Sequence, residues 1–279
     1  MALSVRPPVQ AAWMYAIGAD NTKRLNAGAT PSGTVISLDL LDVKAASIAR
    51  LRKAGRYVIC YYSAGTSESY RTDVDSSKLL TVSLNLGEVG RGGGEIWEGE
   101  KWLDIRGFGQ SEFTQSRSAR IATIKAVMTA RLKLAQSKGC QAVEPDNVDA
   151  WSNDVSQKAP AGTRENAISA ADQLVYNRWT VDTAHGFGLA ALLKNDLNQA
   201  STLVSTYDGA LNEECLSMGE CGLLKPFADA GKAIYIVEYE PASFVTAAHK
   251  KTASKLHLNV ILTDLDVNLA EPLARFGSW

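Results

Sequence analysis

The sequence has no excess of charge of either sign. Its 29 Lys and Arg residues stand against 30 Asp and Glu residues, which gives a formal net charge of -1. Without a strong positive field the surface does not attract nucleic acid, so we expect no nucleic-acid partner. No run approaches the ~20 apolar residues that a membrane helix needs, and we expect no membrane insertion. The first residues also lack the basic-then-apolar pattern of a signal peptide.

Histidine and cysteine are scarce. The 3 histidines are scattered and the 4 cysteines include no Cys-x-x-Cys pair, so a zinc site is not expected. Cys215 and Cys221 are close enough in the chain to form a short disulfide loop. Cys60 lies in an apolar run, where we expect a free thiol that packs as a small hydrophobic residue. Gly-x-Ser-x-Gly is absent, and the glycine-rich stretch at 91–94 is not followed by the Lys-Ser/Thr of a phosphate-binding loop. We expect no cofactor.

The sequence does contain a repeated alternation of two patterns. Short β-branched runs alternate with longer amphipathic stretches between residues 35 and 265, as expected when crossover helices join parallel strands. Helices are expected at 43–54 and 116–137, each followed by a glycine suited to a left-handed C-cap. Eight strands are expected, at residues 35–40, 57–62, 102–105, 142–144, 189–193, 204–211, 233–237 and 259–262.

Eight strands are the number that closes a (β/α)8 TIM barrel. We therefore predict an α/β fold with a single TIM-barrel domain over residues 1–279. Within it, residues 1–12 are expected to form a flexible N-terminal segment. Residues 13–17 form either a ninth, short strand or a lid over one end of the barrel.

The predicted strands run into segments that are rich in carboxylates and aromatic side chains. In TIM barrels the working residues lie at these C-terminal strand ends. Crowded carboxylates repel one another unless they bind a metal, accept hydrogen bonds or meet a polyol or cationic substrate. A glycosidase needs two of them, one to protonate the leaving oxygen and one as nucleophile or base. A divalent metal is the less favoured alternative, because no evenly spaced set of ligands stands out.

Several blocks of sequence make this prediction more specific. They cover residues 58–65, 99–106, 143–149, 193–195, 212–215 and 226–239. In this order they resemble the endo-α-1,4-polygalactosaminidase family of glycoside hydrolases, family 114. The resemblance implies a TIM-type barrel that hydrolyses α-1,4-linked galactosamine polymers. It also implies a galactosamine-rich polysaccharide as partner and a secreted or cell-surface location.

The resemblance also assigns catalytic roles. Asp146, at the end of the fourth predicted strand, is expected to be the nucleophile, and Glu213, at the end of the sixth, the general acid/base. Asp149 and Glu214 are the rivals for these two roles. Substrate-binding residues are expected at Asp39, Tyr62, Asp104, Asn147, Asp149, Lys194, Asn195, Glu214 and Glu238.

Structural alternatives stand beside these roles. Pro145 cannot donate a ladder hydrogen bond, so one alternative is that the fourth strand ends at Glu144 and the next acidic residue caps a helix. Glu144 and Lys194 are candidates for a buried ion pair, which would be structural and not catalytic. Asp104 and Arg106 are candidates for a rim salt bridge.

The predicted chemistry is a retaining double displacement, in which one carboxylate attacks the anomeric carbon while the other protonates the glycosidic oxygen. Two alternatives remain open at this point. The barrel hydrolyses another α-linked sugar, or it binds carbohydrate without cleaving it. The sequence gives no prediction of oligomeric state.

Overall fold

A computed structural model describes residues 6–74, 79, 88–90, 96–109, 115–153, 168–267 and 270–277. The chain groups into two compact units. Unit 1 comprises residues 1–62, 132–144 and 181–279, and unit 2 comprises residues 63–131 and 145–180. The single-domain organisation therefore stays a prediction.

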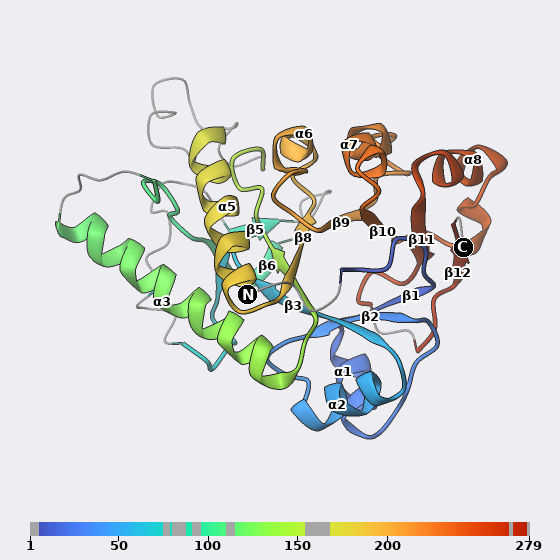
Figure 1. The fold of residues 1–279 in the computed structure, drawn as a ribbon, viewed down its shortest axis with the longest axis horizontal. Helices are drawn as coiled ribbons and strands as arrows, with labels where there is room; N and C mark the ends of the chain where they lie inside the picture. The colour runs from blue at the N-terminus through green and yellow to red at the C-terminus, as the bar shows by residue number, and fades with distance from the viewer. Residues whose placement is uncertain are drawn as a thin grey trace. The chain divides into compact units, whose positions relative to one another are not determined.

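A largely parallel β-sheet forms the centre of unit 1 (Figure 1). Its strands are β1 Trp13–Ala16, β2 Val35–Asp39, β3 Tyr57–Ser63, β7 Ala142–Asp146, β8 Ala190–Lys194, β9 Gly209–Glu213, β10 Ala233–Glu238, β11 Leu258–Leu262 and β12 Ala274–Phe276. Among the described residues they follow one another in this order across the sheet. Six neighbouring pairs from β1 to β11 are parallel, and β12 runs antiparallel to β11.

The first and last parallel strands are linked to each other. The indole N–H of Trp13 on β1 donates to the carbonyl of Asn259 on β11, with 2.8 Å between nitrogen and oxygen. Parallel strands joined by helices, with the end strands in contact, make a TIM-barrel-like α/β fold. The predicted fold class is confirmed.

The predicted number of barrel strands was correct, although one of the predicted strands was placed at the wrong segment. The segment at 13–17, left open as a ninth strand or a lid, is the first barrel strand, β1. The segment predicted at 102–105 is not a barrel strand, because Trp102 ends a strand of a separate sheet. The two errors cancel, so Ala142–Asp146 is still the fourth barrel strand and Gly209–Glu213 the sixth.

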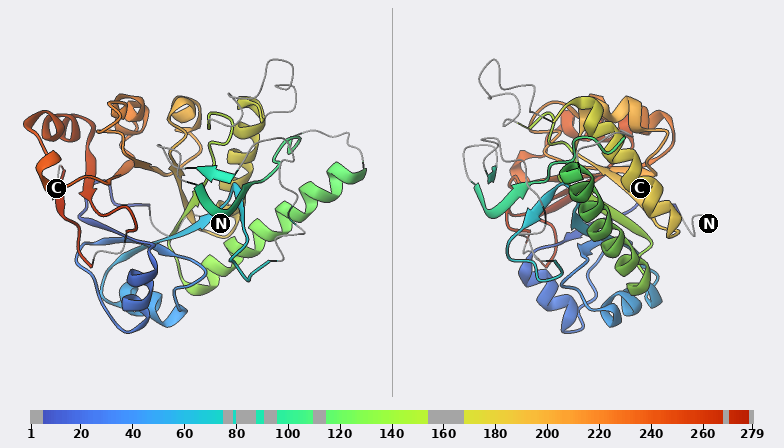
Figure 2. Two further views of the ribbon diagram at one scale, coloured as in Figure 1. Left: turned by 180° about the vertical axis from the view of Figure 1, so that it is seen from behind. Right: turned by 90° about the vertical axis from the view of Figure 1, so that its left-hand side faces the viewer.

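The described helices connect these strands. They are α1 Ala19–Asn26, α2 Ala45–Lys53, α3 Gln115–Lys138, α5 Ala170–Gly186, α6 Ala200–Leu203, α7 Lys225–Asp229 and α8 Ala247–Leu256, with 3-10 turns η3 Leu197–Gln199, η4 Cys221–Leu224 and η5 Ala242–Phe244. Figures 1 and 2 show α6, α7 and α8 in a row beside strands β9 to β11. Gly55 and Gly139 follow α2 and α3 with φ of 76° and 87°, which confirms both predicted C-caps.

Side chains from the strands of the sheet form the hydrophobic core of unit 1. Trp13 contacts the rings of Tyr15 and Tyr235 at centroid distances of 5.6 and 5.4 Å, and all three side chains are buried. Fully burying an aromatic side chain contributes about 1.5–3 kcal/mol each to folding. The Asn259 side chain accepts from the amide of Ala11, so residues next to β1 are fixed to the sheet. Of the N-terminal segment expected to be flexible, residues 1–5 lie outside the described part of the chain.

Unit 2 contains a small antiparallel sheet. Its strands are β4 Thr66–Glu68, β5 Glu88–Gly90 and β6 Ile96–Trp102, in the order β4-β6-β5. β6 pairs with both of its neighbours, and its pairing with β4 places Glu100 opposite Glu68. In the chain, β4 follows β3 after a connection of two residues.

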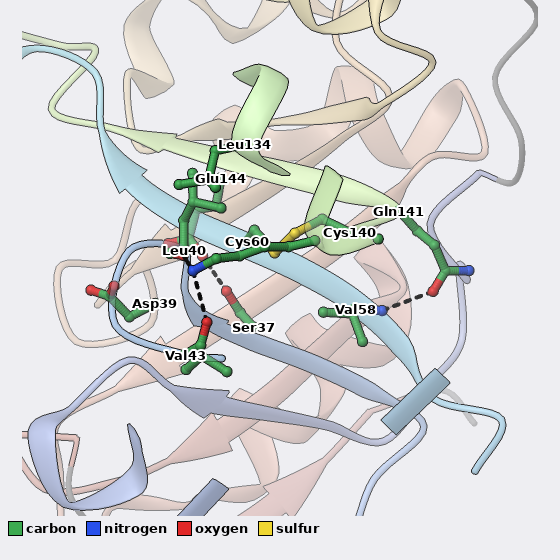
Figure 3. Close-up of a disulfide and its surroundings, with 12 residues drawn as sticks. Ser37, Asp39, Leu40, Val43, Val58, Cys60, Leu134, Cys140, Gln141 and Glu144 are labelled. Carbon is green, nitrogen blue, oxygen red and sulfur yellow. Dashed lines mark hydrogen bonds between the residues drawn. A yellow bond between two sulfur atoms is a disulfide. The ribbon is translucent and has the colours of Figure 1, made fainter. Parts of the chain in front are cut away.

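Both pairs of cysteines are bonded. Cys60 and Cys140 form a disulfide with 6.0 Å between their Cα atoms, so the prediction of a free thiol at Cys60 is wrong (Figure 3). The fold explains the error, because β3 lies beside the segment that leads into β7. There the Val58 amide donates to the Gln141 side chain at 3.1 Å. A separation of 80 residues hides this proximity in the sequence.

The second disulfide joins Cys215 to Cys221 across six positions, which confirms the predicted short loop. Two disulfides are typical of proteins that fold in an oxidising compartment. None of the helices in the described part of the chain is long and apolar enough to span a membrane.

Candidate active site

Four consecutive strands of the sheet end in charged residues. β7 ends at Asp146, β8 at Lys194, β9 at Glu213 and β10 at Glu238, while the positions before them are almost all buried. This pattern follows from the barrel, in which apolar strand bodies pack in the core and polar strand ends reach the rim. Asp146 belongs to unit 2 and the other three belong to unit 1.

Glu213 accepts hydrogen bonds from several neighbours in unit 1. Its Oε2 accepts from the Asn195 amide at 3.0 Å and lies 3.4 Å from the Lys194 Nζ. Its Oε1 accepts from the Tyr239 hydroxyl at 2.5 Å. The Asn195 side chain is itself fixed, because its Oδ1 accepts from the backbone N–H of Glu213 and from Asn212. The carboxylate is thus oriented by three donors, and the Glu213 side chain is 27% exposed to solvent.

These donors determine the charge of Glu213. Burial alone raises its pKa, but the Lys194 ammonium and the hydrogen bonds from Tyr239 and Asn195 together lower the pKa below its usual value. Next to it, burial and then the negative charges of Glu213 and Glu240 raise the pKa of Glu214. The surroundings therefore shift the pKa values of these two adjacent glutamates in opposite directions.

Lys194 is the centre of a buried network in unit 1. It is 1% exposed, and its Nζ donates to the Tyr15 hydroxyl at 2.9 Å and to Glu144 Oε1 at 3.2 Å. Glu144 also accepts from the hydroxyls of Tyr15 at 2.8 Å and Ser37 at 2.6 Å. The predicted buried pair of Glu144 and Lys194 is confirmed. Glu144 is 0% exposed, so its carboxylate is closed off from solvent.

Glu238 supports the loop that follows Glu213. Its two carboxylate oxygens accept from the amides of Leu216 at 2.8 Å and Ser217 at 3.3 Å. Burial raises the pKa of Glu238, although the hydrogen bonds from these amides oppose the change. Together with the Cys215–Cys221 disulfide, this carboxylate fixes the loop at the end of β9.

Asp146 and Asn147 occupy the matching strand end in unit 2. The Asp146 carbonyl accepts from the amides of Ala64 at 2.9 Å and Gly65 at 3.1 Å. Asn147 has a left-handed φ of 59°, and its side chain donates to the Ser63 hydroxyl at 3.0 Å. A Cβ on Gly65 would lie 1.6 Å from the Asn147 carbonyl, so only glycine allows this close approach.

The strand that carries Asp146 passes through a proline. β7 includes Pro145 and ends at Asp146, and no helix follows directly. The alternative in which the strand stops at Glu144 and Asp146 caps a helix is therefore wrong. Pro145 is tolerated because β7 pairs with β8 only through Ala142 and Val143, so the missing N–H interrupts no pairing there.

A second carboxylate cluster in unit 2 involves Asp146. The Tyr70 hydroxyl donates to both Glu100 at 2.7 Å and Glu68 at 3.0 Å, and both glutamates are buried. Burial, together with the negative charges of Glu68 and Asp146, raises the pKa of Glu100 to about 7, although hydrogen bonds from Tyr70 and Thr66 oppose the change. We call Glu68, Tyr70, Glu100 and Asp146 the Glu100 cluster.

The other proposed substrate ligands have varied surroundings. Asp104 forms salt bridges to Arg106 at 2.7 Å and Arg120 at 2.5 Å, which confirms the alternative of a rim salt bridge. Burial raises its pKa, but the two guanidinium groups lower it overall. Asp39 is 3% exposed and accepts from two amides in the turn after β2. Tyr62 is 1% exposed, whereas Asn147, Asp149, Asn195 and Glu214 are half-buried. Sugar binding by any of these residues stays a prediction.

Sequence reasoning missed some of the residues in the surroundings of the two candidate carboxylates. Tyr15 lies on the strand whose role was left open, so its contact with Lys194 had no basis in the pattern. Tyr239 directly follows β10 and was visible as an aromatic residue at a strand end. Glu68 lies on β4 and Glu100 lies on β6. The sequence pattern predicted neither of these strands.

The described residues contain no group of three or more His, Cys, Asp or Glu side chains arranged to hold a metal ion. Glu144 and Glu213 of unit 1 pair with Lys194, and Glu68 and Asp73 of unit 2 pair with Arg131. The chemistry available at these strand ends is therefore that of carboxylates oriented by hydrogen-bond donors.

Comparison with known structures finds similar proteins over almost the whole chain. The Aspergillus fumigatus protein Ega3, crystallised in complex with galactosamine, matches with 25% identity and a TM-score of 0.71, covering 96% of each chain. The glycoside hydrolase domain of PelA from Pseudomonas aeruginosa matches with 13% identity and a TM-score of 0.55, covering 92% of this chain and 95% of that domain. An L-ribulose 3-epimerase matches with 11% identity and a TM-score of 0.50, over 91% of this chain and 81% of its own. The last two show the fold alone.

Among curated protein sequences, none matches this chain. The model of one protein family does match, over residues 2–277, and that family is glycoside hydrolase family GH114. The matched region includes every strand end described above. The chain belongs to glycoside hydrolase family GH114.

Proposed function

We propose that this protein hydrolyses α-1,4-linked galactosamine polymers by a retaining mechanism, with Asp146 as nucleophile and Glu213 as general acid/base. The observation that carries the proposal is the Glu213 carboxylate. In a chain of a glycoside hydrolase family, it ends a barrel strand, reaches solvent and is oriented by Lys194, Asn195 and Tyr239. Asp146 ends the strand two places away in the sheet order.

The galactosamine substrate is supported by similarity and by charge. The Aspergillus fumigatus protein binds galactosamine in its crystal. Galactosamine carries an ammonium group at neutral pH, and half-buried carboxylates such as Asp149 and Glu214 offer it counter-charges. The two disulfides support a secreted or cell-surface location, where such a polymer would be met.

The mechanism requires Glu213 to change its charge twice. It gives a proton to the leaving oxygen in the first step and removes one from water in the second. The donors around it favour the ionised form, which suits the second step. Because the first step needs the protonated form, we expect kcat/KM to be greatest at acidic pH and to fall as pH rises through the pKa of Glu213.

The test is product release from a de-N-acetylated galactosamine polymer, with galactan and an α-glucan as control substrates. The proposal predicts that reducing ends appear with the galactosamine polymer and not with the controls. Release from a control polymer alone would instead identify a hydrolase of another sugar. Binding of the galactosamine polymer without release from any polymer would identify a non-catalytic carbohydrate-binding barrel.

A further inference from the structure

The side chain of Lys194 is deeply buried between charged groups. Its side chain is 1% exposed, and its ammonium lies between two carboxylates, Glu144 at 3.2 Å and Glu213 at 3.4 Å. The rings of Tyr15 and Tyr61 lie beneath it at 5.4 and 5.8 Å. A lysine held in this way has little freedom to move, so its charge acts on Glu213 from a fixed position.

We propose that Lys194 is a positioning residue that keeps Glu213 ionised in the free protein, and that Glu144 sets the strength of this effect. The proposal rests on the proposed function, in which Glu213 is the acid/base carboxylate. Glu144 competes with Glu213 for the same ammonium and adds a negative charge nearby. The balance between the two glutamates therefore determines how readily Glu213 takes up the proton that it must later donate.

The other groups around Glu213 do not provide this control. Within unit 1, the Tyr239 hydroxyl and the Asn195 amide donate to Glu213 but carry no charge. The neighbouring acidic residues Glu214, Glu238 and Glu240 add no positive charge, and the charges of Glu213 and Glu240 raise the pKa of Glu214. Lys194 is thus the positive charge in contact with Glu213 among the described residues of this unit.

The two members of the buried pair have opposite expected effects, which makes the inference testable. Replacing Lys194 removes the cation and makes Glu213 harder to ionise. Replacing Glu144 with Gln leaves the whole ammonium to Glu213 and makes it easier to ionise. A pair with a purely structural role would give no such opposite changes.

The experiment is a 13C NMR titration of the carboxyl groups in protein labelled at glutamate, with the Glu213→Gln variant used to assign the Glu213 signal. We expect titration midpoints that increase in the order Glu144→Gln, wild type, the double variant Lys194→Met/Glu144→Gln, and Lys194→Met. Removal of a charge in direct contact should raise the Glu213 midpoint by about one pH unit or more. Lys194→Arg keeps the charge, so it should stay near the wild-type midpoint.

The double variant keeps the test valid if the single Lys194→Met variant does not fold, because it leaves no buried charge without a partner. Equal Glu213 midpoints in the wild type, Glu144→Gln and the double variant would overturn the inference. So would a downward change in the double variant. Thermal unfolding and circular dichroism identify the variants that are folded.

The pH profile of polymer hydrolysis separates this inference from the proposed function. If Glu213 is the acid, the limb of kcat/KM at higher pH moves upward in the double variant and downward in Glu144→Gln. The substrate's own amines titrate equally with every variant, so they cancel in the comparison. Absence of any hydrolysis would contradict the proposed function but leave the NMR result to decide on Lys194. If the limb of kcat/KM at lower pH moves instead, the role of Lys194 is supported and Glu213 is the nucleophile.

Discussion

Two regions of this molecule hold glutamates on β-strands, Glu213 at the end of β9 and Glu100 within β6, and they shift the pKa of the carboxyl group in opposite directions. Around Glu213, burial is outweighed by the ammonium of Lys194 and by two neutral donors, so the pKa falls. In the Glu100 cluster, burial is reinforced by the negative charges of Glu68 and Asp146, and the pKa of Glu100 rises to about 7. The comparison shows how the sign of the neighbouring charge reinforces or offsets the effect of burial on the pKa of a carboxyl group.

This difference fits the needs of a glycosidase. The chemistry requires carboxyl groups whose environments move their pKa values apart. Near neutral pH, Glu213 is an oriented anion, whereas Glu100 is present in both protonated and ionised forms. Each region therefore supplies a different kind of carboxyl group.

The largest expected effect is on catalysis, with one substitution in each region. Asp146→Asn and Glu213→Gln should each reduce hydrolysis of the galactosamine polymer by roughly 10³-fold, because each removes a group that the double displacement requires. The neighbouring acids provide the comparison, since Asp149→Asn and Glu214→Gln each remove a counter-charge for the substrate and not a catalytic group, and should reduce activity far less. Full activity in both Asp146→Asn and Glu213→Gln would make the assignment of the pair wrong.

The next effect concerns stability in the Glu213 region. Lys194→Met leaves Glu144 as a buried charge without its cation, and should lower the free energy of unfolding by roughly 3–4 kcal/mol at pH 7. Urea unfolding measures the change. The control is Lys225→Met, since Lys225 pairs with Asp229 on an exposed helix surface and should change stability by less than about 0.5 kcal/mol. Equal effects of the two substitutions would show that the buried pair has no special importance.

Glu100→Gln tests the opposite behaviour of the second region. The folded-state pKa of about 7 lies above that of the unfolded chain, so the folded state binds more protons between these values and wild-type stability falls as pH rises from about 4.5 to 7. The neutral Gln removes this loss. Urea unfolding should show that Glu100→Gln gains roughly 2–3 kcal/mol over the wild type at pH 8 and little at pH 4. A gain that does not depend on pH would contradict the raised pKa of Glu100.

The smallest expected effect comes from a neutral donor. Tyr239→Phe removes one hydrogen bond to Glu213 but leaves Lys194 in place, a change of about 1 kcal/mol in the stability of the ionised form. The Glu213 titration midpoint should rise by less than it does in Lys194→Met. An effect of Tyr239→Phe that exceeds that of Lys194→Met would show that hydrogen bonding, and not charge, controls this carboxylate.

The sequence predicted the fold well where local patterns repeat. Buried β-branched runs and helix-ending glycines such as Gly55 and Gly139 mark the barrel units because they depend on local geometry. The first strand was missed as a barrel member because Trp13–Ala16 is only four residues long. The strand expected at 102–105 was misplaced because Trp102, Leu103 and Ile105 are apolar and buried, as in a barrel strand, although Trp102 ends a strand of the small sheet.

The candidate site was predictable only in part. Strand ends and the family resemblance indicate Asp146 and Glu213, and the pairing of Glu144 with Lys194 followed from opposite charges on inward-facing strands. The surroundings were beyond reach of the sequence, because they join segments far apart in the chain. Tyr15 lies 179 positions from Lys194, and the partner of Cys60 lies 80 positions away.

The most direct test of the proposed carboxylate pair is a crystal structure with galactosamine bound. Asp146 and Glu213 belong to different units, so their separation is the quantity to measure. The proposed retaining mechanism predicts that the two carboxyl groups lie about 5–5.5 Å apart on either side of the anomeric carbon. A separation of roughly 6.5–9.5 Å would contradict retention, and a larger one, or galactosamine bound away from both residues, would contradict the pair itself.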